Sequence, residues 1–195
     1  MVYIKKVGKD KRKALFNVIQ KYLYEMSKYY GDEMDEDGVY EYRYLPFYFE
    51  DNDRSVYFIY DDEVWIGFAL LNKYSFTGEK IDNAIAEFSI FPAYRNKGYA
   101  MDAIKLLVEE RKGSWQFKYA INNANGSCFW KKVKQKYRGS EISLGCILRR
   151  RTDTGAFAGG HSAALADIDF FCLSGYFSFN NDIVVLRYPF KHGVG

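Results

Sequence analysis

The chain has 195 residues and a formal net charge of +3 at pH 7, and 48% of its residues are hydrophobic, 19% aromatic and 27% charged. This length predicts one domain with a sizeable core, the composition excludes an intrinsically disordered chain, and the small positive charge excludes nucleic acid as the expected partner. The first residues lack the apolar run of a signal peptide, and the longest stretch without charged side chains, residues 154–166, is too short to span a bilayer, so we expect a cytoplasmic protein with no membrane partner.

The first part of the chain predicts a strand, a long helix and a β-hairpin. Residues 3–7 are typical of a short strand, and apolar side chains at three- and four-residue steps over residues 11–30 predict a helix. We expect Asp10 to be the N-cap of this helix and Gly31 to be its C-terminal stop. Two β-rich runs separated by three acidic residues then predict a hairpin, with strands at residues 55–60 and 64–71.

An acidic segment and an aromatic segment lie between this helix and the hairpin. Residues 32–38 invite a calcium interpretation, but a calcium loop aligned on Gly38 places Tyr44 where a bidentate carboxylate is required. We therefore interpret the acidic segment as a solvated turn. Residues 39–50 are rich in tyrosine and phenylalanine and are interrupted by Pro46, which predicts a short helix and a loop packed on an apolar surface.

Strands and helices alternate in the second part of the chain. After a loop, the patterns predict a strand, a helix, a strand and a helix over residues 84–91, 98–112, 115–121 and 126–137. A hairpin-rich first half followed by this alternation predicts an α/β (α+β) fold with one mixed central sheet flanked by helices.

The segment from residue 85 to residue 100 runs from a strand through a tight turn into a helix. Small residues at Gly98 and Ala100 let a ligand approach the backbone closely, and the first turn of the helix offers free N–H donors and the positive end of its dipole. This arrangement suits a diphosphate, with Arg95 and Lys97 adding positive charge. The alternative is an ordinary strand-to-helix turn with a basic surface.

Two motifs in this order resemble the GNAT superfamily of N-acetyltransferases, over residues 3 to 138. Arg95-Asn96-Lys97-Gly98-Tyr99-Ala100 is similar to the family's Arg/Gln-x-x-Gly-x-Gly/Ala diphosphate motif. The run from Asn123 through Gly126 to Phe129 and Trp130 resembles the family's Asn-x-x-Ala-x-x-Phe-Tyr helix. The resemblance implies a GNAT-like acyl-CoA N-acyltransferase fold in a domain comprising residues 1–148.

The resemblance also implies the reaction and the residues that bind acetyl-coenzyme A. A primary amine, on a small molecule or a peptide, attacks the thioester directly, without a metal or a covalent intermediate. The acetyl and pantetheine groups are expected against the backbone of the motif strand and the diphosphate on the following turn, with Asn123 beside the coenzyme or a water. The residues implied in coenzyme binding are Ser89, Ile90, Phe91, Arg95, Asn96, Lys97, Gly98, Tyr99, Ala100 and Asn123.

For the groups that accept and donate protons, the sequence leaves more than one candidate. Glu87 is the one carboxylate in residues 84–91 and is our candidate proton acceptor, the alternative being that it points toward a lysine or solvent. Trp130 occupies the position of a family tyrosine that protonates the leaving thiolate, and indole cannot do so. Either a tyrosine of residues 40–48 acts instead, or the thiolate leaves without a dedicated acid. Asn123 could equally cap the following helix.

Other candidate features are weaker. Cys128 has no neighbouring His or Asp in the sequence that would make it a nucleophile, and the three cysteines form no Cys-x-x-Cys pair, so we expect reduced, mostly buried thiols. The basic run 131–138 is either a solvated helix face or a contact for the coenzyme 3′-phosphate or an acidic partner.

The acidic segment and the aromatic segment lie where the family builds its acceptor site, which favours a cationic or amphipathic amine. A non-catalytic coenzyme A sensor is the alternative function, and a homodimer is left open.

The C-terminal segment, residues 149–195, does not fit this family. Residues 1–138 hold 17 of the 18 lysines and 16 of the 18 tyrosines, whereas residues 139–195 hold 8 of the 16 glycines and both histidines. Residues 141–148 can supply one more strand, and later strand-like runs could complete the sheet. The remainder is an extension, an interaction segment or the product of a shifted reading frame.

Overall fold

The computed structural model describes residues 1–120, 122–137 and 144–149, and within them six strands form one sheet in the order β1-β2-β3-β4-β5-β6. The first four strands pair antiparallel, whereas β4–β5 and β5–β6 pair parallel. This confirms the predicted mixed central sheet. The strands are β1 (Val2–Val7), β2 (Ser55–Asp61), β3 (Val64–Asn72), β4 (Asn83–Ile90), β5 (Trp115–Ala120) and β6 (Leu144–Arg149).

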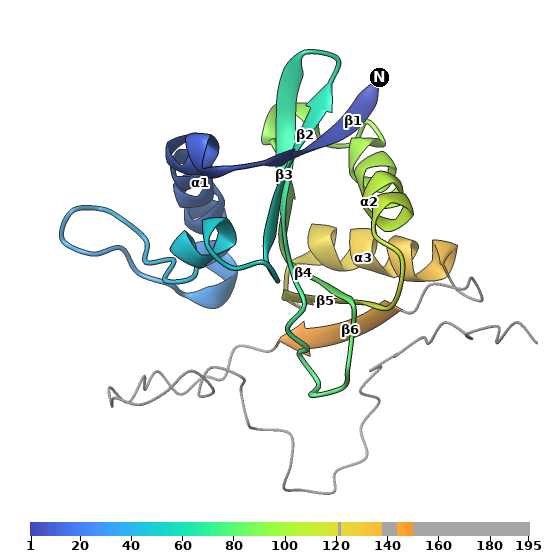
Figure 1. Ribbon diagram of the computed structural model, residues 1–195. Coiled ribbons are helices and arrows are strands. Elements are labelled where there is room, and N and C mark those ends of the chain that lie inside the picture. The colour runs from blue at the N-terminus through green and yellow to red at the C-terminus, as the bar shows by residue number, and fades with distance from the viewer. Residues whose placement is uncertain (121, 138–143, 150–195) are drawn as a thin grey trace, which may run out of the picture.

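Helices cover both faces of the sheet. Figure 1 shows α1 (Arg12–Tyr30) on one face, and α2 (Tyr99–Glu110) and α3 (Ala124–Lys136) on the other. Three short 3-10 helices lie in the connections: η1 (Lys9–Lys11), η2 (Pro46–Phe49) and η3 (Pro92–Tyr94). The sequence predicted the three long helices and the short helix around Pro46, with bounds that differ by a few residues.

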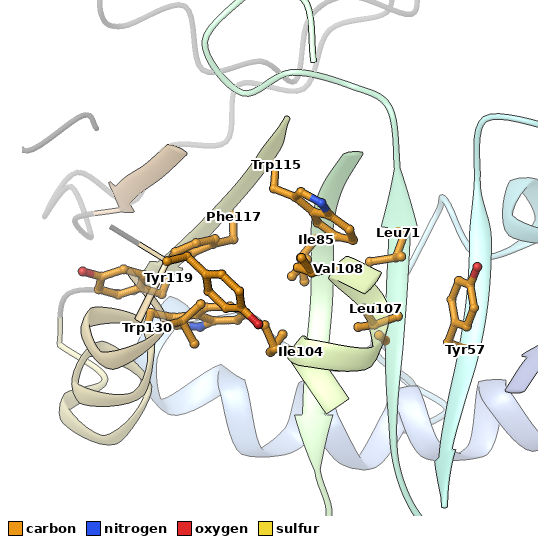
Figure 2. Packing of buried hydrophobic residues seen from close by; sticks show 13 residues of the cluster. Tyr57, Leu71, Ile85, Ile104, Leu107, Val108, Trp115, Phe117, Tyr119 and Trp130 are labelled. Carbon is orange, nitrogen blue, oxygen red and sulfur yellow. The ribbon is translucent and has the colours of Figure 1, made fainter. Parts of the chain in front are cut away.

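Two layers of apolar side chains hold the helices to the sheet. Leu15 and Ile19 of α1 are fully buried against Phe58 and Phe68. On the opposite face, Figure 2 shows side chains of α2 and α3 packed on the strands, including Ile104, Leu107 and Trp130. Because β2 and β3 carry helices on both faces, nearly all of their side chains are buried, and these strands read as continuous apolar runs.

The sequence predicted the C-terminal end of α1 correctly but not its N-cap. Gly31 adopts the left-handed conformation (φ 74°) and its N–H bonds the carbonyl of Ser27, so the predicted stop is confirmed. The predicted N-cap is wrong. Asp10 lies inside η1, and Lys11 precedes α1 without a side-chain capping bond. The additional 3-10 turn moves the helix start beyond the reach of the Asp10 carboxylate.

The expectations for the C-terminal part lie mostly outside the described residues. The predicted strand at 141–148 is present as β6, which pairs with β5 over Trp115–Ala120. The segment 150–195, which includes Cys172, falls outside the described part of the chain. The domain division predicted after residue 148 lies near the end of β6 (Leu144–Arg149) and stays a prediction.

Candidate active site

The sheet opens between the carboxyl-terminal halves of β4 and β5. Parallel pairing covers three residues of each strand, ending at Ile85 and Phe117. Immediately beyond Ile85 the β3–β4 register shifts, since Leu71 opposes Ile85 but Leu70 opposes Glu87, which leaves Ala86 as an extra residue. A bulge of this kind bends its strand, and ligands of open α/β sheets bind beyond the carboxyl ends of the strands. The opening is therefore the first candidate for a binding site.

The register of β4 decides which backbone groups face this opening. Opposed residues of an antiparallel pair alternate between hydrogen-bonded and non-hydrogen-bonded pairs. The Phe91 N–H bonds the Ile66 carbonyl at 2.8 Å, so Ile90 and its partner Gly67 form a non-hydrogen-bonded pair. The N–H and C=O of Ile90 thus point away from β3, whereas the N–H groups of Ser89 and Phe91 point toward it. Of the three residues expected at the acetyl group, Ile90 has the available donor.

Gly67 makes this part of the site possible by its lack of a side chain. A Cβ on Gly67 would lie 2.4 Å from the backbone oxygen of Ser89 and 2.9 Å from the Ile90 side chain. Such contacts require the backbone of β4 to move, so a residue larger than glycine would shift the segment that borders the opening.

The turn after β4 presents a row of backbone donors. Asn96 (φ 62°) and Gly98 (φ 87°) adopt left-handed conformations, and α2 begins directly afterwards. Within the described part of the chain, the N–H groups of residues 96–100 have no hydrogen-bond partner, whereas those of Met101 and Asp102 bond the Gly98 carbonyl. No atom lies within 4 Å of the position of a Cβ on Gly98. Successive free N–H groups at a helix N-terminus form an anion-binding concavity.

The Arg95 side chain has partners that the sequence did not predict. Its Nη1 and Nη2 donate to the two carboxylate oxygens of Glu25 at 2.6 and 2.7 Å, and its Nε donates to the Ile90 carbonyl at 2.7 Å. The hydrogen bond from Arg95 lowers the pKa of Glu25, and the same bond raises the pKa of Arg95. The expected additional charge for an anion is thus neutralised at Arg95, while Lys97 remains exposed beside the Tyr94 ring.

Glu87 lies on the α1 face of β4 between two tyrosines. The Tyr22 hydroxyl donates to Glu87 Oε2 at 2.7 Å, and the Tyr42 hydroxyl lies 3.3 Å from Oε1. These two hydroxyls are partners of Glu87 that the sequence did not predict. Burial, followed by the charge of Glu87, raises the pKa of both phenols well above the usual value, so both remain protonated donors near neutral pH. Tyr22 belonged to the apolar stripe of α1, and only its distance to Glu87 marks it as part of the site.

Two of the tyrosines of residues 40–48, Tyr42 and Tyr48, are poor candidates for the acid that protonates a thiolate. Tyr48 of η2 is 4% exposed, and burial together with the charge of Glu87 raises its pKa to about 12. A free thiol has a pKa of about 8.5, so proton transfer from such a phenol to a thiolate is uphill.

The second motif has structural roles at both of its main positions. Trp130 is buried, and its ring stacks on that of Phe117 with the centroids 4.3 Å apart. Figure 2 shows the two side chains beside each other. Asn123 Oδ1 accepts the Gly126 N–H at 2.9 Å, which confirms the capping interpretation of Asn123. A Cβ at Gly126 would lie 2.8 Å from Asn123 Nδ2. The contact of Asn123 with a coenzyme stays a prediction.

Other features of the described residues contribute little to the site. Cys128 is exposed on α3, contrary to the expectation of mostly buried thiols. The acidic segment is a turn closed by Asp35, whose carboxylate accepts the N–H groups of Asp37 and Val39. The described residues contain no group of three or more His, Cys, Asp and Glu placed to hold a metal ion. None of the helices described above is long and apolar enough to cross a membrane.

A comparison with protein-family models identifies the family of this chain. The model of the "Acetyltransferase (GNAT) family" matches residues 16–125. No curated protein matches the chain. Among solved structures, a possible acetyltransferase from Clostridium difficile 630 shares 11% identity at a TM-score of 0.50, over 84% of this chain and 99% of that chain.

Two further structures are similar at lower scores. A ribosomal-protein-alanine N-acetyltransferase from Brucella melitensis biovar Abortus 2308 has 15% identity and a TM-score of 0.49, over 68% of this chain and 89% of that one. An aminoglycoside acetyltransferase from an uncultured soil metagenomic sample has 13% identity and a TM-score of 0.48, over 83% of this chain and 99% of that one. At these identities the likeness concerns the fold alone.

Proposed function

Since the chain belongs to the acetyltransferase (GNAT) family, we propose that it transfers an acetyl group from acetyl-coenzyme A to a primary amine by direct attack. The observation that carries this proposal is the opening between β4 and β5 together with the free N–H groups of residues 96–100 at its end. An extended thioester fits along the opening, and its diphosphate fits on the N–H groups.

The proposed reaction uses positioning and one backbone donor. The amine nitrogen attacks the thioester carbonyl carbon, the C–N bond forms, and the C–S bond breaks to release coenzyme A as a thiolate. The Ile90 N–H is the proposed donor to the carbonyl oxygen, on which negative charge develops. Because the tyrosines near Glu87 have raised pKa values, the thiolate leaves without a dedicated acid and takes its proton from solvent.

Glu87 is the proposed proton acceptor. The amine must lose its ammonium proton before attack, and it must lose another proton as the amide forms. Two tyrosine hydroxyls donate to the Glu87 carboxylate and hold it in place. An ionised carboxylate can both attract a cationic amine and accept its proton, directly or through a water.

The acceptor is proposed to be cationic or amphipathic, either a small molecule or a peptide. Glu87 supplies the negative charge, and the two tyrosines whose hydroxyls donate to it, Tyr22 and Tyr42, bring aromatic rings near it. Ammonium groups bind well on aromatic faces. The protein is proposed to act in the cytoplasm.

A non-catalytic coenzyme A sensor is the alternative, favoured by the absence of a tyrosine at the position of Trp130. Release of thiol from acetyl-coenzyme A should be measured against a panel of small cationic amines and peptide N-termini, with Gly98→Trp as the variant that fills the anion site. We expect thiol release with at least one amine class and no binding by Gly98→Trp. Binding of the coenzyme without turnover of any amine would support the sensor, and absence of binding by the unmodified protein would contradict both functions.

A further inference from the structure

One face of α1 is bonded to both sides of the opening. The Tyr22 hydroxyl bonds Glu87 in β4, Glu25 pairs with Arg95 in the turn after β4, and the Tyr29 carbonyl accepts Asn122 Nδ2 at 3.2 Å, just after β5. Residues three and four positions apart lie on the same side of a helix. The helix therefore fixes the middle of β4, the turn after β4 and the turn after β5 relative to one another.

We propose that Glu25 and Arg95 are a positioning pair for coenzyme binding, and that Arg95 does not itself bind the diphosphate. This inference rests on the proposed function, because it concerns the same anion site. It assigns a role to Glu25, a residue of α1 that lies 70 positions before its partner in the sequence.

The first argument is that the hydrogen bonds of Arg95 are already committed. Two short bonds to Glu25 form the bidentate pair that is among the stronger arrangements of arginine, and the third goes to the Ile90 carbonyl. The side chains are 37% and 31% exposed, so the pair is partly withdrawn from water. If Arg95 turned to a diphosphate, Glu25 would be left as an unpaired carboxylate near another anion.

The second argument is that Arg95 orders the groups that the ligand would meet. Through Nε it satisfies the Ile90 carbonyl, which points away from β3 into the opening and would otherwise present negative partial charge to the coenzyme. Through its own backbone it begins the turn whose N–H groups at residues 96–100 are free. Lys97 is exposed, with its ammonium 5.5 Å from the centroid of the Tyr94 ring, and it supplies positive charge beside this turn.

Three variants separate positioning from direct contact: Glu25→Gln, Arg95→Gln and Arg95→Lys. Lysine keeps the positive charge but cannot reproduce the planar fork. If Arg95 positions the turn, all three variants weaken the binding of acetyl-coenzyme A by a similar factor of about fivefold, and Glu25→Gln/Arg95→Gln is no weaker than either single variant. Kd is measured by calorimetry well below the Tm of every variant.

Direct contact predicts a different pattern. Removing the charge of Glu25 would then release Arg95 and tighten binding, and Arg95→Lys would bind almost as well as the unmodified protein. Either result overturns the positioning proposal. So does a loss of Tm in Glu25→Gln with unchanged Kd, because that result describes a structural ion pair alone.

The control is the exposed ion pair of α2, Lys105 to Glu109, whose charged atoms are 3.8 Å apart. Glu109→Gln removes one negative charge from a helix, as Glu25→Gln does. It should leave the Kd for acetyl-coenzyme A unchanged. If the unmodified protein does not bind acetyl-coenzyme A, the proposed function fails. If it binds and Glu25→Gln binds equally well or better, only the positioning pair fails.

Discussion

At the scale of single residues, Glu87 is defined by what surrounds it. Its two carboxylate oxygens face Tyr22, from α1, and Tyr42, from the aromatic segment. Both phenols are held protonated by burial, so they act as hydrogen-bond donors and not as bases. Glu87 is thus the group of this cluster that can accept a proton.

Glu87→Gln is expected to lower kcat by a factor of about 10² to 10³, because the amide cannot accept the amine proton. The Kd for acetyl-coenzyme A should remain unchanged, since the carboxylate lies on the α1 face and the diphosphate donors lie in the turn. Steady-state kinetics and calorimetry measure the two quantities. An unchanged kcat would remove Glu87 from the mechanism.

The site residues differ in how far the sequence could predict them. Gly98 and its free N–H neighbours follow from a local motif, and so did the candidacy of Glu87 on a short strand. The partners of Glu87 and Arg95 did not follow, because Tyr22 and Glu25 are 65 and 70 residues away from them. In a periodic helix pattern Tyr22 looks like any other apolar residue, and nothing in the sequence marks Glu25 as paired.

At the scale of elements, the helices and strands were predictable because their side chains repeat with the period of each structure. The bulge at Ala86 was not predictable, because it depends on how β3 and β4 align. The N-cap of α1 was mispredicted for a related reason: a local capping preference at Asp10 was overridden by the 3-10 turn that joins β1 to the helix.

Gly67→Ala tests the close approach of β3 to β4. The new methyl group would lie 2.4 Å from the Ser89 oxygen, so we expect a loss of about 1 to 3 kcal/mol in the free energy of unfolding, with weaker coenzyme binding as β4 shifts. Gly8→Ala is the matched control, because its nearest contact would be Asp10 Oδ1 at 3.5 Å. Denaturant unfolding of both variants measures the effect. Equal stability of the two would show that β4 tolerates a side chain at position 67.

The bond between α1 and the turn after β4 predicts a pH dependence of stability. The Arg95 hydrogen bond lowers the pKa of Glu25 from its usual value of 4.5. A lowered folded-state pKa contributes stability above the unfolded-state value, and this stability is lost as pH falls through the folded-state value. The difference in free energy of unfolding between the unmodified protein and Glu25→Gln should therefore be full above pH 4.5 and shrink at lower pH. A difference that is constant from neutral to acidic pH would contradict it.

At the scale of the whole molecule, the chain has two parts of different composition. The part that belongs to the GNAT family contains the opening between β4 and β5. The family model ends at residue 125, within α3, whereas the lysine and tyrosine content falls after residue 138. A shifted reading frame is one explanation of that change. It predicts that translating the gene downstream of Leu144 in one of the other two frames gives a lysine-rich continuation. If neither frame gives a lysine-rich continuation, this explanation fails. The C-terminal segment is then an extension or an interaction segment.

The central claim is that the opening between β4 and β5 holds acetyl-coenzyme A. A crystal structure of the complex tests it most directly. We predict diphosphate oxygens within about 2.7 to 3.2 Å of the N–H groups of residues 96–100, and the thioester oxygen within the same distance of the Ile90 N–H. A coenzyme bound elsewhere, or a thioester oxygen without a backbone donor from β4, would contradict the account.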